Sequence, residues 1–111
     1  MAAAGAETPC VFCEIVAGTA SAEVVYADEV AVAVLEVRPL FAGHTLVVPR
    51  RHVVTLSDLP PADVGPFFGR VRENSRLLPG ALDAEGTFVA NNNVVSQSVA
   101  HLHVHVVPRR R

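Results

Sequence analysis

The sequence predicts an α+β domain in which one main helix packs against a mostly antiparallel sheet. Three observations predict this class: short runs of β-branched residues, one amphipathic segment in the middle of the chain, and no regular alternation of strands with helices. A chain of 111 residues, half of them hydrophobic, has the size and apolar content of a single domain. We expect a flexible tail over residues 1–9 and one domain over residues 10–111.

The elements before the main helix are short. Residues 11–17 fit one or two helical turns that end at Gly18. Two β-branched runs are separated by the turn at 27–29, which predicts a hairpin, and a further run follows it. The strands expected here cover residues 24–26, 30–37 and 44–49.

The main helix is predicted from apolar residues at the i, i+3, i+4, i+7 spacing of one helix face. These residues are Val64, Phe67, Phe68, Val71 and Leu78. We expect the dipeptide Pro79-Gly80 to end this helix. The last two strands are expected over residues 87–92 and 99–107.

Composition excludes several classes of function. The net charge of −2 argues against a nucleic-acid partner or a polybasic membrane binder. All nine basic residues are arginine, so the chain has no Schiff-base or P-loop lysine. Neither a signal peptide nor an apolar run of about 20 residues is present, and two cysteines are too few for a disulfide scaffold. We therefore expect a cytoplasmic protein.

Three histidines alternate along the last predicted strand: His101, His103 and His105. Because side chains alternate across a strand, all three share one face and Leu102 and Val104 point to the other. Such histidines are often ordinary polar residues, but three in alternation also fit two kinds of site. One is a zinc hydrolase in which the strand supplies metal ligands, and the other uses one imidazole as a nucleophile. The spacing does not choose between them.

The sequence HLHVHVVPR, from His101 to Arg109, resembles the signature of the histidine-triad (HIT) family of nucleotide hydrolases and transferases. Blocks at 10–18, 43–52 and 91–98 also resemble family blocks in the same order, so the likeness covers nearly the whole chain. The resemblance implies a HIT-like fold with a short N-terminal helix before the main helix. It also implies a homodimer whose sheet continues across the two-fold axis.

The resemblance assigns the catalytic groups. The middle histidine, His103, would attack the α-phosphorus of a nucleotide and become nucleotidylated. His105 and Ser98 would contact the α-phosphate and the leaving-group side, with His44 coming from a neighbouring strand and His101 completing the triad. Donors at these places stabilise the charge that grows on phosphoryl oxygens.

The resemblance also assigns a nucleotide-binding set. Glu36 stands where the family usually has an Asp that binds the ribose hydroxyls, and Ser96 stands where a Gly commonly precedes the Gln. The phosphate or leaving group would be bound by polar side chains, and the base by an apolar wall for which core packing is an equal alternative. The expected binding residues are Glu36, Asn91, Gln97, Phe12, Ile15 and Val37.

The pair Cys10 and Cys13 forms a C-x-x-C motif, which by itself is typical of a redox pair, of half a zinc site or of chance. A bacterial branch of the HIT family carries the same motif together with a histidine after Pro-Arg-Arg. That resemblance implies a structural zinc ion held by Cys10, Cys13, His52 and His101, and no organic cofactor.

The function expected from these residues is hydrolysis or transfer of a nucleoside monophosphate through a nucleotidyl-His103 intermediate. The substrate would be an AMP-phosphoramidate, an acyl-adenylate or a similar purine nucleotide. Within enzymes, the alternatives are a diadenosine polyphosphate hydrolase or phosphorylase and a zinc-water hydrolase. The alternative of another class is a catalytically weak, nucleotide-binding regulatory protein.

Overall fold

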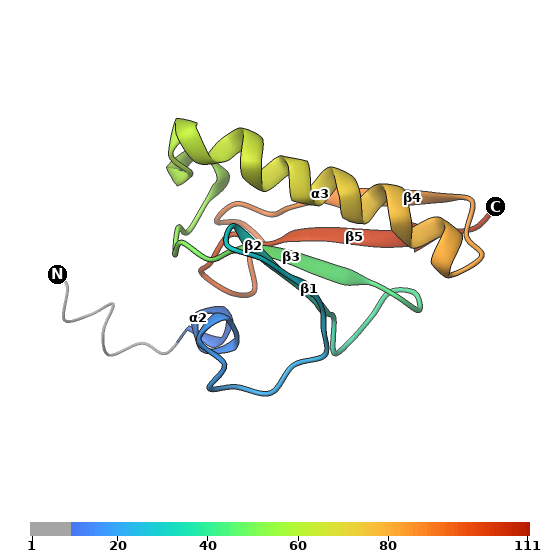
Figure 1. The fold of residues 1–111 in the computed structure, drawn as a ribbon, viewed down its shortest axis with the longest axis horizontal. Helices are drawn as coiled ribbons and strands as arrows, with labels where there is room; N and C mark the ends of the chain where they lie inside the picture. Colours follow the sequence, from blue (N-terminus) through green and yellow to red (C-terminus); the bar gives the residue numbers. More distant parts are fainter. Residues whose placement is uncertain (1–9) are drawn as a thin grey trace, which may run out of the picture.

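The computed structural model describes residues 10–111, and the tail expected over 1–9 lies outside them. These residues form one antiparallel sheet of five strands in the order β1-β2-β3-β5-β4, with helix α3 on one face and helix α2 on the other (Figure 1). In chain order the elements are α2 (Val11–Ala17), β1 (Val24–Ala27), β2 (Ala31–Leu35), β3 (Thr45–Pro49), a 3-10 turn (Leu56–Asp58), α3 (Pro61–Ala81), β4 (Gly86–Ala90) and β5 (Val104–Arg109). The predicted α+β class, with one main helix and a short N-terminal helix, is confirmed. Neither helix of the described region is long and apolar enough to cross a membrane.

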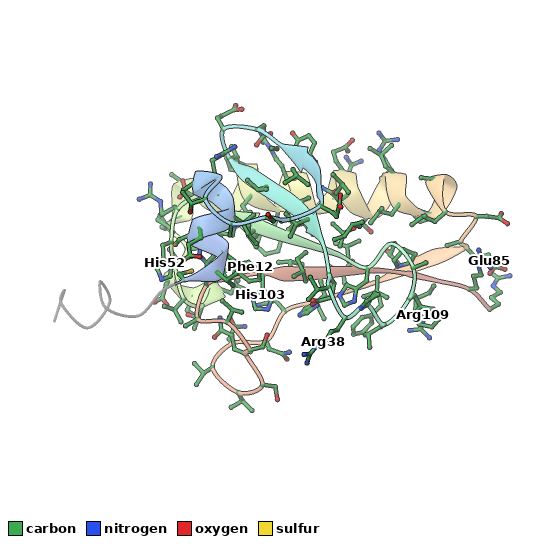
Figure 2. The ribbon with its side chains drawn as sticks, turned by 90° about the horizontal axis from the view of Figure 1, so that it is seen from below. Phe12, Arg38, His52, Glu85, His103 and Arg109 are labelled. Atoms are coloured by element: carbon green, nitrogen blue, oxygen red, sulfur yellow. The ribbon has the colours of Figure 1, made fainter. Side chains whose placement is uncertain are left out.

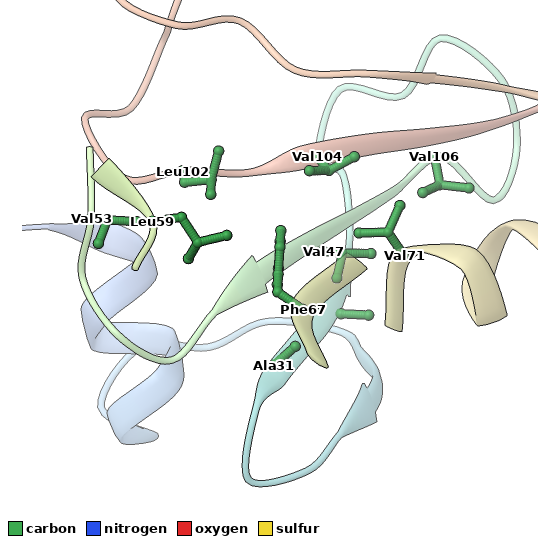
Figure 3. Close-up of a cluster of buried hydrophobic side chains, with 10 residues drawn as sticks. Ala31, Val47, Val53, Leu59, Phe67, Val71, Leu102, Val104 and Val106 are labelled. Atoms are coloured by element: carbon green, nitrogen blue, oxygen red, sulfur yellow. The ribbon is translucent and has the colours of Figure 1, made fainter. Parts of the chain in front are cut away.

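The two faces of the sheet carry separate cores because successive side chains of a strand point to opposite faces. Ala31 and Ala33 of β2 belong to the core under α3, which is built around Phe67 (Figure 3). Val32 and Val34 belong to the core under α2. The α2 face is the face on which the histidines lie.

Helix α2 begins and ends where the sequence predicts. Cys10 is the N-cap, and its sulfur accepts a hydrogen bond from the backbone N–H of Cys13. Gly18 ends the helix in the left-handed conformation, with φ of 81°, and its N–H bonds back to the carbonyl of Ile15. This is the glycine-ended helix that local sequence signals favour.

Helix α3 runs beyond the expected stop at Pro79 and continues to Ala81. A proline inside a helix lacks one N–H donor, but near the C-terminal end its carbonyl still accepts. Here the carbonyl of Pro79 accepts from the N–H groups of Leu82 and Ala84. The expectation that Pro79-Gly80 ends the helix was therefore wrong by one residue, because the helix ends at Ala81, directly after this pair.

The last strand begins at Val104 rather than Val99, so His101 and His103 precede β5 and only His105 lies within it. The β3–β5 ladder ends at the pair Val47–Val104, and Pro49 has no N–H to extend it. Residues 101–103 still alternate, since Leu102 is buried in the α3 core while the histidines face α2. The predicted face is correct although the predicted strand is too long.

Candidate active site and metal centre

His103 is held with one ring nitrogen fixed as a donor. Its Nδ1 lies 2.8 Å from the backbone carbonyl oxygen of His101, and the side chain is 3 % exposed. A carbonyl oxygen only accepts, so Nδ1 carries the proton and donates it. The Nε2 atom of a neutral His103 consequently has a free lone pair, which is the form of imidazole that acts as a nucleophile.

A chain of three hydrogen-bonding groups fixes the neighbouring histidines. The backbone N–H of Leu40 donates to Nδ1 of His44 over 3.1 Å, and Nε2 of His44 lies 2.9 Å from Nδ1 of His105. Because Leu40 supplies the proton to the first bond, a neutral His44 carries its own proton on Nε2 and donates it to His105. His105 then holds its proton on Nε2, where it is free to donate to a ligand.

Burial favours the neutral form of both rings in this chain. It lowers the pKa of His44, which is 3 % exposed, and it lowers the pKa of the half-buried His105. The neighbouring imidazoles lower the pKa of His105 further, whereas the Glu36 carboxylate opposes the shift at both histidines. The neutral forms of His44 and His105 are thus favoured, and in these forms both rings donate hydrogen bonds without carrying charge.

His101 faces a different set of partners. Its Nε2 lies 3.0 Å from the carbonyl oxygen of Pro49, which makes Nε2 the donor and leaves the Nδ1 lone pair free. That Nδ1 atom lies 3.4 Å from Sγ of Cys10, 3.5 Å from Sγ of Cys13 and 3.1 Å from Nδ1 of His52. The sulfur of Cys13 is also 3.1 Å from Nδ1 of His52.

These four side chains fit a tetrahedral zinc ion. With metal–ligand bonds of about 2.0–2.3 Å, tetrahedral geometry holds nitrogen and sulfur ligands roughly 3.3–3.8 Å apart. The four contacts above, from 3.1 to 3.5 Å, lie at or slightly below this spacing, and the ligand atoms of all four side chains lie within 4.8 Å of one another. The bond from His101 to Pro49 is the outer contact that orients a metal-binding imidazole. Burial raises the pKa of Cys13 to about 11, so a cation is needed to hold that sulfur as a thiolate at neutral pH.

A second group, Glu36, His44 and His105, also brings three candidate ligand atoms within 4.8 Å. A metal on Nε2 of His44 would move the proton of that ring to Nδ1, where it would face the N–H of Leu40. Two donors would then oppose each other in a buried place, which is costly. The hydrogen bonds therefore assign this group to proton positioning rather than to a metal.

Phe12 joins the two histidine sets. Its ring packs edge-on against His101, with centroids 5.8 Å apart, and against His103, at 5.0 Å. Figure 2 shows Phe12 on α2 directly beside His103, with His52 at the same end of the molecule. Phe12 also belongs to the core under α2, with Val32 and Leu46 among its partners. Helix α2 and the central histidine, His103, are thus in direct contact through the side chain of Phe12.

The loop over residues 91–100 carries three of the expected site residues. Both ends of the Gln97 amide are used within the protein, since its Nε2 donates to the carbonyl of Val54 and its Oε1 accepts from the N–H of Val94. Asn91 donates to Asn93, whose Oδ1 also accepts from the N–H of Leu56. Ser98 is exposed.

Sequence reasoning missed the role of Asn93 in tying this loop to the segment before α3. Of the three consecutive asparagines, sequence alone gave no signal that distinguished it. The loop also contains two non-glycine residues with positive φ, Val94 at 69° and Ser96 at 61°. A left-handed residue at position 96 is consistent with the expectation that a glycine suits this place.

The remaining residues predicted to bind the nucleotide, Glu36, Ile15 and Val37, differ in their surroundings. The carboxylate of Glu36 is half-buried beside His44 and His105, and it accepts from the N–H of Arg38 over 3.4 Å. Ile15 packs against the core under α2, whereas Val37 is 89 % exposed. Glu36 is therefore brought to the histidines, and Val37 is free of packing contacts that would explain it as core.

Gly43 is a further residue that the site requires. It has a φ of 86°, and a Cβ atom there would lie 2.0 Å from Cδ1 of Leu82. The left-handed backbone strains any other residue, and a Cβ atom would also require the side chain of Leu82 to move. Gly43 directly precedes His44, so the conformation of Gly43 helps to position the backbone from which the His44 side chain extends. The sequence signal for it was a glycine directly before the strand expected from residue 44, at the start of the block over 43–52.

The fold and the site together define a class: α+β proteins with alternating histidines at the start of a sheet strand. The HIT domain family model matches residues 17–111, and the chain belongs to this family of hydrolases and transferases. It is 40% identical over 104 residues to an uncharacterized HIT-like protein of Mycobacterium tuberculosis, covering 92% of this chain and 72% of that one. A crystal structure of a zinc-bound histidine triad family protein from Mycobacterium smegmatis is 42% identical, with a TM-score of 0.86 over 92% of this chain and 76% of that chain.

Two more distant relatives carry names of activities. An adenylylsulfatase of Arabidopsis thaliana is 31% identical, covering 94% of this chain and 54% of the relative. An asymmetrical bis(5'-nucleosyl)-tetraphosphatase of Schizosaccharomyces pombe is 31% identical, covering 80% of this chain and 50% of the relative.

Proposed function

We propose that the chain hydrolyses or transfers the nucleoside monophosphate of an adenosine nucleotide through a covalent intermediate on Nε2 of His103. The single observation that carries the proposal is the 2.8 Å hydrogen bond from Nδ1 of His103 to the carbonyl oxygen of His101. This bond leaves the lone pair of Nε2 free. In the first step Nε2 attacks the α-phosphorus, and the bond to the leaving group breaks with its electron pair. In the second step water attacks the same phosphorus, the phosphorus–nitrogen bond breaks with its electron pair returning to Nε2, and the proton of the water passes to solvent.

The neighbouring groups would stabilise the charge of the reacting phosphoryl group. The proton on Nε2 of His105 is free to donate, because His44 occupies its Nδ1. His44 itself has both nitrogens engaged, so it acts by orienting His105. Ser98 lies exposed on the loop before the histidines and is proposed as the second donor to the phosphate.

The nucleoside would lie beside Glu36, whose carboxylate offers two acceptors for ribose hydroxyls. The apolar wall proposed for the base uses Phe12, Ile15 and Val37, of which only Val37 is fully exposed. Asn91 and Gln97 are proposed to shape the phosphate loop, through the bonds they make within it, and so to bind the nucleotide.

The candidate zinc shell would serve the fold. Four protein ligands fill a tetrahedral ion, which leaves no open position for a catalytic water, so a bound zinc would link α2 to the histidines as a structural centre. A closed shell of four ligands therefore favours the covalent mechanism over a zinc-water hydrolase. Cys10, Cys13, His52 and His101 would hold the ion.

A homodimer fits the edge of the sheet. Among residues 10–111, β4 pairs with β5 alone, and Phe88 and Val89 on it are 48 % and 44 % exposed. An unpaired strand edge with apolar side chains is a template for pairing with a second copy. We also expect the protein to work in the cytoplasm, without nucleic-acid or membrane partners, which agrees with the net charge of −2.

The test is AMP release from adenosine 5′-phosphoramidate by the unaltered chain and by His103→Ala, each with and without brief exposure to a chelator. We expect activity that is lost in His103→Ala and kept under brief chelation. Activity that survives the substitution would overturn His103 as the nucleophile. Activity that is lost on chelation with His103 intact would favour a zinc-water hydrolase.

A second candidate substrate class is a dinucleoside polyphosphate, which the name of the Schizosaccharomyces pombe relative favours. Supplying diadenosine tetraphosphate with water or with inorganic phosphate, and identifying the products, distinguishes a hydrolase from a phosphorylase. Binding of AMP without turnover of either substrate class would favour the regulatory alternative.

A further inference from the structure

We propose that Cys10 and Cys13 form a site of reversible oxidation, at which a peroxide joins the two sulfur atoms and releases the tether between α2 and the histidines. The proposal rests on the zinc shell of the proposed function and not on the nucleotidyl chemistry. It concerns what the cysteine pair does, beyond holding a metal.

The two cysteines are placed where a disulfide closes easily. Cys10 is the N-cap of α2 and Cys13 is three residues later, within the first turn. The N–H of Cys13 already donates to the sulfur of Cys10 over 3.3 Å, and the two sulfurs lie within 4.8 Å of each other. Cys10 has an extended backbone, with φ of −110° and ψ of 111°, so the helix does not fix its side chain. Redox-active C-x-x-C pairs use the same spacing.

The cluster is also open to small solutes on one side. Both cysteines are half-buried, and His52, the third member, is exposed. The contact between Cys13 and His52 is exposed, whereas His101 is completely buried beneath the pair. A molecule of the size of hydrogen peroxide therefore reaches the sulfurs from the His52 side without opening the core.

The chemistry balances with hydrogen peroxide as the only added oxidant, and two protons from solvent enter when the sulfurs start as zinc-bound thiolates. One sulfur attacks the peroxide, the O–O bond breaks, and a sulfenic acid and a water result. The second sulfur then displaces the hydroxyl as a second water and forms the S–S bond. The two thiols are oxidised by two electrons, and one peroxide is reduced to two waters. A disulfide sulfur carries no charge and does not hold zinc, so only His52 and His101 remain as ligands.

Oxidation changes which parts of the fold are connected. A disulfide between residues 10 and 13 closes one helical turn on itself, whereas the metal shell connects that turn to residues 52 and 101. Phe12 lies in the same turn and packs against the rings of His101 and His103. Loss of the tether therefore acts on the surroundings of the central histidine through α2.

The experiment uses the full chain loaded with one equivalent of zinc and treated with stepwise additions of hydrogen peroxide. Released zinc is measured with a chromophoric chelator, free thiols by titration, and the covalent change by mass. We expect one zinc to be released for each pair of thiols lost, with a mass change of two hydrogens. Amide exchange over 11–17 should increase, and a thiol reductant with added zinc should reverse every change.

Three variants make the result specific. His52→Ala removes an exposed ligand but keeps both thiols, so it should form the disulfide faster than the unaltered chain. Cys13→Ser leaves one thiol and should form no intramolecular disulfide. His103→Ala should release zinc as the unaltered chain does, which separates this test from the nucleotidyl proposal. Zinc that stays bound under peroxide, thiols that end irreversibly as sulfinic acids, unchanged exchange of α2 after disulfide formation, or a chain that binds no zinc would each overturn the proposal.

Discussion

The backbone N–H of Leu40 donates to Nδ1 of His44, and this one bond determines the proton positions of two imidazoles. Leu40 lies in the connection between β2 and β3, outside every motif that the histidines belong to. Because an amide N–H only donates, it forces the proton of a neutral His44 onto Nε2 and so the proton of His105 onto its own Nε2. A backbone group thus decides which nitrogen of His105 carries the proton.

The first prediction tests this relay. His44→Leu fills the same buried space without hydrogen bonds, and it should lower kcat for AMP release at least about tenfold, since a correctly oriented donor contributes roughly 10²–10³ in rate. His44→Gln has one acceptor and one donor, and it should keep more of the activity. The nitrogen-15 shifts of His105 should report the Nε2-protonated form in the unaltered chain and a mixture in His44→Leu. Equal activity of the two variants would contradict the relay.

The second prediction concerns metal content and stability. The purified chain should hold one zinc ion, and removal by a chelator should lower the melting temperature. At a hundredfold excess of zinc over its Kd the stabilisation is about 2.7 kcal/mol, which corresponds to on the order of 10 °C for a domain of this size. Cys13→Ser should resemble the chelated chain. As the control, Asp83→Ser, on the segment after α3, should leave zinc content unchanged.

The third prediction is a loss of stability in acid. Burial lowers the pKa of His44 and of His105, so below about pH 6.5 the unfolded chain binds more protons than the folded one. The free energy of unfolding should be largest above about pH 6.5 and should decrease as the pH falls through that value toward the lower folded-state pKa values. Urea unfolding of the chelated chain between about pH 5 and 8 measures this without interference from zinc loss. The slope should be smaller in His44→Gln, and an identical slope would assign the effect to other groups.

The fourth prediction compares two glycines. Gly43→Ala should destabilise the chain by about 2 kcal/mol or more, because it combines a left-handed backbone with a contact that Leu82 must yield to. It should also reduce activity, since His44 follows directly. Gly69 lies within α3 with nothing within 4 Å of its absent Cβ, so Gly69→Ala should instead stabilise by about 0.5–1 kcal/mol. Thermal unfolding of both variants decides between these signs.

Local signals were sufficient for the elements that are determined locally. Helix α2 and its stop at Gly18 follow from a few neighbouring residues, and the face shared by the three histidines follows from alternation alone. The start of β5 could not be predicted in this way. It depends on where Pro49 of the partner strand interrupts the ladder, which sequence periodicity does not contain.

The candidate site also has one part that could be predicted from the sequence and another part that could not. The resemblance named four candidate zinc ligands, and the structure brings those four side chains together. The internal bonds of the loop over 91–100 were beyond sequence reasoning, because Gln97 and Asn93 find their partners at Val54 and Leu56, some forty residues away. Which nitrogen of each histidine carries the proton also depends on such distant backbone groups.

The candidate metal shell has a consequence for how the protein is made. Cys10 leaves the ribosome first, and its partner His101 follows 91 residues later. Since a domain folds as a unit while its N-terminal part is made first, both cysteines would stay without their histidine partners until the sheet has formed around His101. A metal ion held by these four side chains would therefore be acquired late in biogenesis, and it would mark those chains in which the first helix and the histidine segment have met.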